Sequence, residues 1–374
     1  MTIWNRALAA ADAMEPGAVI SVYDGTLRIE ARGFADAEHT IALAPDAIFR
    51  MSSLSKPITA LALILALEEH GIDLHAPVST WLPELGTPRV LLDPTGDLDR
   101  TEPARRAITV EDLLTSRMGT GIVLAPPGST PIQLEIERRG LVGFGPPNPA
   151  APMDAESWIA QLGALPLLAH PGEQWLYSVS SNVQGVLVSR LSGMALSDFL
   201  AERIFEPLGM VDTGFSVPHM KLSRLTPAYS SAFALTDPAA GGAWSRPPSF
   251  EAGEGGLVST AADYMAFVRM LHGERRLLSD RWIAAMLADH LDDRQRAHAA
   301  MFLDGRGWGY GLSVDAGRTP SDAMAGTIGW SGGLGASWIS DLARGMAVLS
   351  LSSRALDDPE VYGGHLAIQR AALG

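Results

Sequence analysis

The amino-acid sequence contains no cysteine. That absence excludes disulfide bonds, thiolate nucleophiles and cysteine-ligated zinc sites. No stretch reaches the roughly 18 uncharged apolar residues of a membrane-spanning helix, so we expect no membrane span. Arg6 and Asp12 interrupt the N-terminal stretch, which therefore lacks the unbroken apolar core of a signal peptide, and we expect a cytoplasmic protein.

Positive charge is also scarce. The formal net charge is −14, and a field of this sign repels phosphate backbones, which disfavours nucleic acid as a partner. Lysine is rarer still, because the chain has two, Lys56 and Lys221, beside 26 arginines. The histidines show no metal-ligand spacing, so we expect no metal site.

The 374 residues are 47% hydrophobic, which allows a sizeable core and exceeds the usual length of a single domain. Strand-like patterns lie at both ends of the chain and helix-like patterns fill the middle. The sequence therefore predicts an α+β fold with an antiparallel sheet built from both chain ends, flanked by helices, and a mostly helical lobe. We expect one domain, 1–374, with a sheet lobe of 1–75 and 255–374 and a helical lobe of 76–254.

Individual elements follow from periodicity and from turn and cap signals. Asp24-Gly25 joins two alternating stretches and predicts a hairpin, and Thr109 with Asp112 predicts a capping box. We expect helices over 3–14, 53–70, 154–163, 180–192, 196–206 and 358–373, a loop over 140–153, and strands over 18–25, 26–36, 307–315, 323–330, 334–341 and 344–353.

Three serines lie close to Lys56 in the stretch "RMSSLSKPIT", residues 50–59. A serine three residues before a lysine shares its helix face, and Ser53 alone has that relation. Ser55 is adjacent to the lysine and points elsewhere, while Ser52 lies outside a helix that begins at Ser53. A serine at a helix N-terminus also sits where backbone N–H groups favour negative charge.

Lys56 is a candidate proton acceptor because this chain otherwise uses arginine for positive charge. Arginine cannot be deprotonated in a protein, whereas a desolvated lysine can. The apolar run that follows Lys56 would supply the desolvation. The alternative is that Ser53 caps a helix and Lys56 is a surface residue, since a Ser-x-x-Lys match arises often by chance.

Further motifs follow in order along nearly the whole chain. They are "FRMSSLSKPITALALILALEEHGIDLHAPVSTWLPEL", "ITVEDLLTSRMG", "HPGEQWLYSVSSNVQGVLV", "RIFEPLGMVDTGF", "GGLVSTAADYMAFVRML" and "GWSGGLGASW". Together they resemble the serine β-lactamase and penicillin-binding-protein superfamily, and within it the esterases related to class C β-lactamases, called family VIII carboxylesterases. The resemblance implies a β-lactamase/transpeptidase-like fold and one catalytic domain that acts through an acyl-enzyme without a cofactor.

Motif matching implies roles for individual residues. Ser53 is similar to the acyl-accepting nucleophile of the family and Lys56 to its proton partner. Tyr177 matches the catalytic tyrosine, and a hydrogen bond between its phenol and Lys56 would suit that role. A buried structural tyrosine is the alternative.

The tyrosine motif is not intact. The family's Tyr-x-Asn would require asparagine where this chain has Val179, and Ser180-Ser181-Asn182 fits the Ser-x-Asn form instead. We favour Tyr177 because the residues before it match the esterases. Ser180 and Asn182 are expected in the first turn of the next helix, with Asn182 kept as a candidate substrate-binding residue.

Trp330, Ser331 and Gly332 stand where the family has Lys-Thr-Gly, and the resemblance implies that they contact the substrate. The backbone N–H groups of Gly333 and Ser53 would form the oxyanion hole. Loss of the motif lysine removes a cation that would hold a substrate carboxylate, which favours neutral esters. A core aromatic on a strand is the alternative for Trp330.

The stretch "GWSGG", residues 329–333, also fits the Gly-x-Ser-x-Gly nucleophile elbow of α/β-hydrolases. That elbow needs a strand, a sharp turn and then a helix, whereas Ser331 is followed by glycines and a strand-like stretch. The downstream residues that could complete a triad are Asp341, Asp357, Asp358 and His365. We therefore expect the elbow match to be accidental.

The sequence thus predicts a serine hydrolase that cleaves small-molecule carboxylic esters through an acyl-enzyme on Ser53, with Lys56 and Tyr177 as acid and base. Hydrolysis of β-lactams, amides or D-amino-acid peptides, and transacylation, are alternatives on the same site. A catalytically silent binding scaffold is a remote alternative, which the three intact residues oppose.

Overall fold

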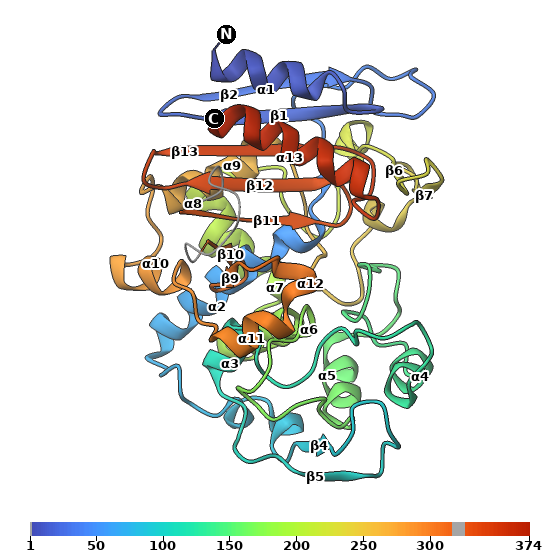
Figure 1. Cartoon of the computed structure of the whole chain (residues 1–374), viewed down its shortest axis with the longest axis vertical. Helices are drawn as coiled ribbons and strands as arrows, with labels where there is room; N and C mark the ends of the chain where they lie inside the picture. Colours follow the sequence, from blue (N-terminus) through green and yellow to red (C-terminus); the bar gives the residue numbers. More distant parts are fainter. Residues whose placement is uncertain (1, 316–325) are drawn as a thin grey trace.

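The central sheet combines the two ends of the chain. The computed structural model describes residues 2–315 and 326–374. Seven strands of this part form one sheet in which all neighbours are antiparallel. From edge to edge they are β2 (Leu27–Gly33), β1 (Gly17–Tyr23), β13 (Met346–Leu351), β12 (Ala336–Asp341), β11 (Thr327–Gly332), β10 (Ser313–Val314) and β9 (Gly307–Trp308). Val22 lies opposite Val348, so the first hairpin pairs with the last strand and the expected sheet is confirmed (Figure 1).

Each face of the sheet has its own layer of helices. Helices α1 (Ile3–Ala11) and α13 (Pro359–Leu373) lie on one face, and α9 (Ala261–Leu271) lies on the other (Figure 1). Because strand side chains alternate, Val348 packs with the α1 and α13 layer, whereas Leu349 packs into the main core. Helices thus cover both faces, and almost every residue of β11, β12 and β13 is buried.

A group of helices lies below the sheet in Figure 1. Helix α2 (Ser55–His70) packs against α6 (Val179–Ser192), and both are buried along most of their length. A helix that is buried on nearly every side is covered by other elements, so these two helices form the centre of this part of the protein. The other helices are α3 (Val110–Leu114), α4 (Pro131–Arg138), α5 (Ala155–Gly163), α7 (Leu196–Leu200), α8 (Glu206–Leu208), α10 (Asp280–Met286), α11 (Asp293–His298) and α12 (Ala300–Leu303). Three short strand pairs are β3 (Phe49–Arg50) with β8 (Val258–Ser259), β4 (Arg89–Leu91) with β5 (Thr101–Pro103), and β6 (Ala228–Tyr229) with β7 (Leu235–Asp237).

The helix expected over 53–70 begins differently. It starts with a 3₁₀ turn, Ser52–Leu54, and becomes α-helical at Ser55. Pro57 has no N–H to donate to the carbonyl of Ser53, so the first turn closes with shorter-range bonds. Ser53 therefore lies in a tight turn just before α2.

Among the other local expectations, some agree with the structure and one does not. The capping box of Thr109 and Asp112 is present at the start of α3, and 140–153 contains no helix or strand. The helix expected over 196–206 is interrupted, because a π-helical turn, Ala201–Phe205, follows α7. Residues 323–325 of the strand expected over 323–330 lie outside the described part. The two-lobe division of the domain stays a prediction.

The described residues contain neither a candidate membrane span nor a candidate metal cluster. None of their helices is both long and apolar enough to cross a membrane. None of their His, Asp and Glu side chains form a group of three or more that could hold a metal ion.

Candidate active site

Ser53 is partly exposed in an otherwise buried stretch. Within residues 47–64, all of which the structure describes, it is the one residue that is not buried. Ser52, directly before it, has a φ of 46°, a left-handed conformation that is strained for a residue other than glycine. The hydroxyl of Tyr264 donates to the carbonyl of Leu54 at 3.2 Å, and burial raises the pKa of Tyr264 well above its usual value. The Tyr264 hydroxyl thus keeps its proton and holds the turn through this hydrogen bond.

Lys56 lies one turn further along and is 1% exposed, which excludes a surface role. Its Nζ donates to Ser53 Oγ at 2.9 Å, the contact expected from their spacing. The same Nζ is 2.6 Å from the backbone oxygen of Glu254 and 3.3 Å from the Oε2 atom of its carboxylate. An ammonium group has three N–H donors, and these three acceptors match them in number.

Tyr177 lies beside Lys56 and contacts it through its aromatic ring. Lys56 Nζ is 4.5 Å from the centroid of the Tyr177 ring, a cation–π contact. The expected bond between phenol and lysine is not formed in the described part of the chain, because the Tyr177 oxygen instead accepts a hydrogen bond from Trp330 Nε1 at 2.7 Å. The ring is fixed in this orientation by an aromatic cluster that contains Trp175, Phe302, Trp308 and Trp330.

Strand β11 passes directly over the turn that carries the serine. Gly332 permits this approach, because a Cβ atom there would lie 2.1 Å from the carbonyl oxygen of Met51. Trp330, two residues earlier, is half-buried and points its indole at Tyr177. The strand therefore supplies an N–H donor at the position where the family motif has a lysine.

The two neighbours of Gly332 line the same cavity as Ser53. The Oγ atom of Ser331 lies 2.8 Å from the Oγ of Ser337 on β12. Gly333 is exposed, and its carbonyl accepts from the N–H of Leu356 at 2.8 Å, which fixes this peptide group.

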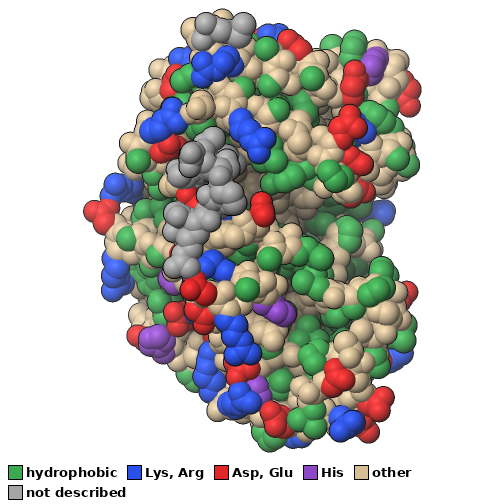
Figure 2. All heavy atoms as spheres, in the orientation of Figure 1, with side chains coloured by type: hydrophobic (Ala, Val, Ile, Leu, Met, Phe, Trp, Pro, Cys, Tyr) green, Lys and Arg blue, Asp and Glu red, His purple; other side chains and the backbone are tan. Residues whose placement is uncertain are grey.

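A cavity of about 690 Å³ opens at Ser53 between the sheet and α12. Figure 2 shows this face hollowed between the sheet and the helices below it, with apolar side chains around the hollow. Arg306 also lines the cavity; its guanidinium donates to the carbonyl of Thr327 at 2.7 Å, and burial lowers its pKa. Of the site residues expected from the sequence, the cavity brings together Ser53, Tyr177, Trp330, Ser331 and Gly333.

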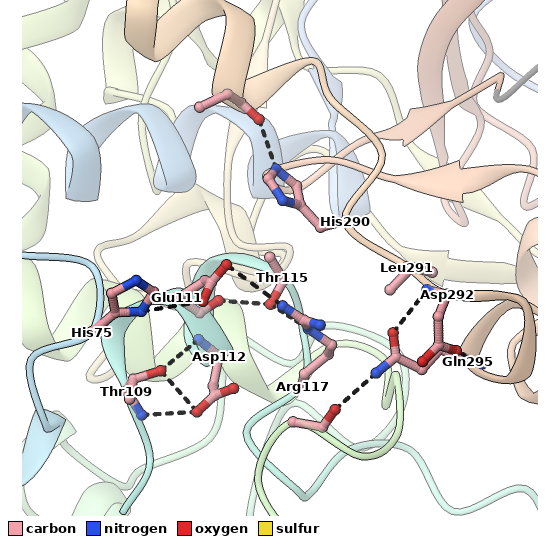
Figure 3. A network of polar contacts seen from close by, with 12 residues as sticks. His75, Thr109, Glu111, Asp112, Thr115, Arg117, His290, Leu291, Asp292 and Gln295 are labelled. Carbon is pink, nitrogen blue, oxygen red and sulfur yellow. Dashed lines mark hydrogen bonds and ion pairs between the residues drawn. The ribbon is translucent and has the colours of Figure 1, made fainter.

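Figure 3 shows a network of polar contacts around α3 and α11 that includes Arg117 and Gln295. In this network the Arg117 guanidinium lies 3.7 Å from the carboxylate of Glu111, and the Arg117 carbonyl accepts from the N–H of Gly172 at 2.8 Å. Gln295 of α11 donates to the carbonyl of Gly172 at 2.8 Å. Two distant parts of the chain thus hold Gly172, which lies shortly before Tyr177 in the sequence.

Asn182 lies in the first turn of α6, as expected, but it does not line the cavity. Its Oδ1 accepts from the backbone N–H of Glu254 at 3.0 Å. Glu254 is 2% exposed and its carboxylate also accepts from the hydroxyl of Ser178 at 3.0 Å. The role of this acid is not evident from the sequence, because its one signal is a charge among glycines, and glycine-rich turns commonly carry surface charge. Tight packing buries it: a Cβ at neighbouring Gly253 would lie 2.6 Å from the carbonyl of Ser181.

The nucleophile elbow is not formed. Strand β11 ends at Gly332, and the chain then turns into strand β12 instead of a helix. His365 is fully buried and its Nδ1 lies 2.6 Å from Ser350 Oγ, so it does not serve Ser331. Burial lowers the pKa of His365 to about 4. The accidental nature of the elbow match is therefore supported by the fold.

Comparison with protein families matches residues 5–373 to the family described as Beta-lactamase. The chain belongs to the beta-lactamase family. The matched residues include the Ser53 turn, α2 and β11, and the resemblance drawn from the motifs is confirmed.

Curated relatives cover most of this beta-lactamase-family chain. Protein Rv1367c of Mycobacterium tuberculosis is 36% identical over 352 residues, which are 90% of this chain and 85% of the relative. Esterase EstB of Burkholderia gladioli is 28% identical over 376 residues, covering 95% of this chain and 90% of the relative.

Solved structures with a similar fold include a hydrolase and a synthase. EstCE1, described as a hydrolase with promiscuous acyltransferase activity, has a TM-score of 0.79 and 25% identity and covers 100% of this chain and 98% of its own. Simvastatin synthase LovD from Aspergillus terreus has a TM-score of 0.78 at 21% identity, with coverage of 100% and 98%, and shows the fold alone. The family and its esterase neighbours identify this beta-lactamase-family protein as a serine hydrolase with a β-lactamase/transpeptidase-like fold.

Proposed function

We propose that this protein hydrolyses carboxylic esters of small molecules through an acyl-enzyme on Ser53. The observation that carries the proposal is the 2.9 Å contact between Ser53 Oγ and the buried Lys56 Nζ, beside a cavity that Tyr177 and Trp330 also line. The names of EstB, an esterase, and EstCE1, a hydrolase, support this reaction class.

The first half of the reaction forms the acyl-enzyme. Ser53 Oγ attacks the ester carbonyl carbon and gives its proton to the Tyr177 oxygen, which acts as the base in its phenolate form. The N–H of Trp330 and the charge of Lys56 stabilise that phenolate before the attack. The N–H groups of Ser53 and Gly333 hold the negative oxygen of the tetrahedral intermediate. Tyr177 then returns the proton to the departing alcohol.

The second half releases the acid. Water attacks the acyl carbon and gives a proton to Tyr177, the bond to Ser53 Oγ breaks, and that proton passes to Ser53. Trp330 contributes an N–H without a positive charge, which supports neutral esters over substrates whose carboxylate needs a cation at this position.

A fluorophosphonate probe tests the nucleophile directly. Mass spectrometry of the labelled protein should place the label on Ser53, S331A should label as the wild type does, and S53A should not label. A panel of p-nitrophenyl esters should be hydrolysed far faster than a chromogenic cephalosporin. Label on Ser331, or no label at all, would contradict the proposal, and the second result would favour a silent scaffold.

Acyl transfer is a second candidate on the same site. The observation that favours it is the acyltransferase activity in the description of EstCE1. Transfer replaces water by an alcohol in the second half of the reaction. Adding a primary alcohol to the p-nitrophenyl assay should then yield a new ester, whereas formation of the free acid alone would exclude transfer to that alcohol.

A further inference from the structure

Glu254 is a buried acid beside the reacting serine for which the proposed mechanism has no use. Its side chain is 2% exposed, and its Oε2 lies 3.3 Å from Lys56 Nζ. The Oε1 atom has no hydrogen-bond partner within residues 2–315 and 326–374. In the same part of the chain, Lys56 is the cation paired with it. A buried carboxylate is strongly unfavourable unless it is paired, so this acid depends on the charge of Lys56.

The position of the carboxylate is fixed from several sides. Ser178, which donates to Oε2 at 3.0 Å, has a φ of 86°, a conformation rarely adopted outside glycine. Asn182 binds the backbone N–H of Glu254, and Gly253 packs against the carbonyl of Ser181. A strained backbone conformation of this kind persists only where the surrounding structure holds it in place. Such conformations are common at functional sites.

Few charged groups face the Lys56 ammonium. Glu254 approaches from the loop before β8, and the ring of Tyr177 approaches from the segment before α6. From the turn before α2, Ser53 contributes a neutral hydroxyl. Burial alone would favour the neutral amine of a lysine, whereas a carboxylate in contact favours the ammonium. The three acceptors around Nζ match the three donors of an ammonium.

We propose that Glu254 is a positioning residue that keeps Lys56 as an ammonium. Lys56 then directs one of its protons at Ser53 Oγ, and acceptance of the serine proton falls to Tyr177 rather than to the lysine. In this arrangement Glu254 stays a carboxylate and Lys56 keeps its three protons throughout, so the serine proton moves to Tyr177 and back as described above. The inference deepens the proposed function and rests on it for its kinetic test.

The scarcity of lysine makes a direct test available. Lysine labelled with carbon-13 and nitrogen-15 gives NMR signals from Lys56 and Lys221, and K221R leaves Lys56 alone. At pH 7 we expect Lys56 of the wild-type protein to give the signal of an ammonium. The signal of a neutral amine in the wild type would by itself overturn the proposal. E254Q keeps the size of the side chain and an acceptor for Ser178 but removes the charge. Lys56 should lose its ammonium signal at a lower pH in E254Q than in the wild type, and an unchanged midpoint would also overturn the proposal.

Glu251→Gln is the matched control, because Glu251 lies in the same loop and its carboxylate accepts from the N–H of Ser197 at 2.8 Å instead of contacting Lys56. E251Q should leave the Lys56 midpoint where it is in the wild type.

The kinetic test follows kcat/KM for a p-nitrophenyl ester across pH. In E254Q the alkaline limb, which reports loss of the ammonium, should move to lower pH by the same amount as the NMR midpoint. A uniform decrease at every pH with both limbs unmoved indicates a merely structural acid and overturns the proposal. If the wild type neither hydrolyses esters nor labels at Ser53, the proposed function fails, and the NMR titration still decides whether Glu254 holds Lys56 as an ammonium.

Discussion

Replacing Trp330 by phenylalanine measures how far the tyrosine base depends on its indole donor. Trp330 Nε1 donates to the Tyr177 oxygen at 2.7 Å, and Tyr177 is 7% exposed, so water cannot readily replace that donor. Phenylalanine keeps a ring in the aromatic cluster but has no N–H. A hydrogen bond to a charged group contributes about 1.5–3 kcal/mol, and about 1.4 kcal/mol corresponds to tenfold in rate. We therefore expect kcat/KM to fall roughly 10- to 150-fold in W330F.

The assay is hydrolysis of a p-nitrophenyl ester followed across pH. Loss of the donor disfavours the phenolate, so the acid limb of the W330F profile should move to higher pH as well. Trp308→Phe is the matched control, because Trp308 packs against Trp330 at 4.8 Å between ring centroids and its Nε1 has no hydrogen-bond partner in the described residues. W308F removes the same atoms without removing a bond to Tyr177. Equal losses in the two variants, or an unmoved acid limb in W330F, would refute the reasoning.

Two predictions concern stability, measured by urea unfolding. Asp237→Ala leaves the guanidinium of Arg50, which is 2% exposed, without its buried partner, so the free energy of unfolding should fall by about 3–5 kcal/mol. Asp24→Ala breaks an exposed pair with Arg28 and should lower the free energy of unfolding far less. A similar loss of stability in both variants would contradict the importance of burial. Burial lowers the pKa of His365 from 6.5 to about 4, so the unfolded state takes up the proton first. Stability should be complete above about pH 6.5 and decrease by about 3 kcal/mol as the pH falls toward 4; His365→Asn should flatten this dependence, and an equally steep decrease in that variant would be evidence against it.

The sequence predicted features that depend on local spacing. The contact of Ser53 with Lys56 follows from three residues of separation on one turn, and it is present although the turn is 3₁₀ rather than α-helical. The sheet from both chain ends was also predictable, because its strands carry apolar patterns of the right length between glycine-rich turns. In both cases the pattern that supports the prediction lies within a short stretch of neighbouring residues.

Contacts between distant parts of the chain were not predictable in this way. Glu254 is 198 residues from Lys56, and Trp330 is 153 residues from Tyr177. Nothing in the neighbourhood of either residue indicates which partner it meets, because packing of separate elements decides that. The same holds for Asn182, whose amide turned out to hold the Glu254 backbone instead of facing the cavity.

The pairing of β1 with β13 has a consequence for synthesis of the protein. A chain is made from its N-terminus, so the β1–β2 hairpin emerges from the ribosome long before β13 exists to cover its inner edge. During that interval the hairpin presents an apolar, unpaired strand, the kind of edge on which chains aggregate. The serine turn likewise waits for β11 to cross over it. A stalled or shortened chain therefore carries the nucleophile without a working site, and the nascent chain depends on protection of its first hairpin until the last strands arrive.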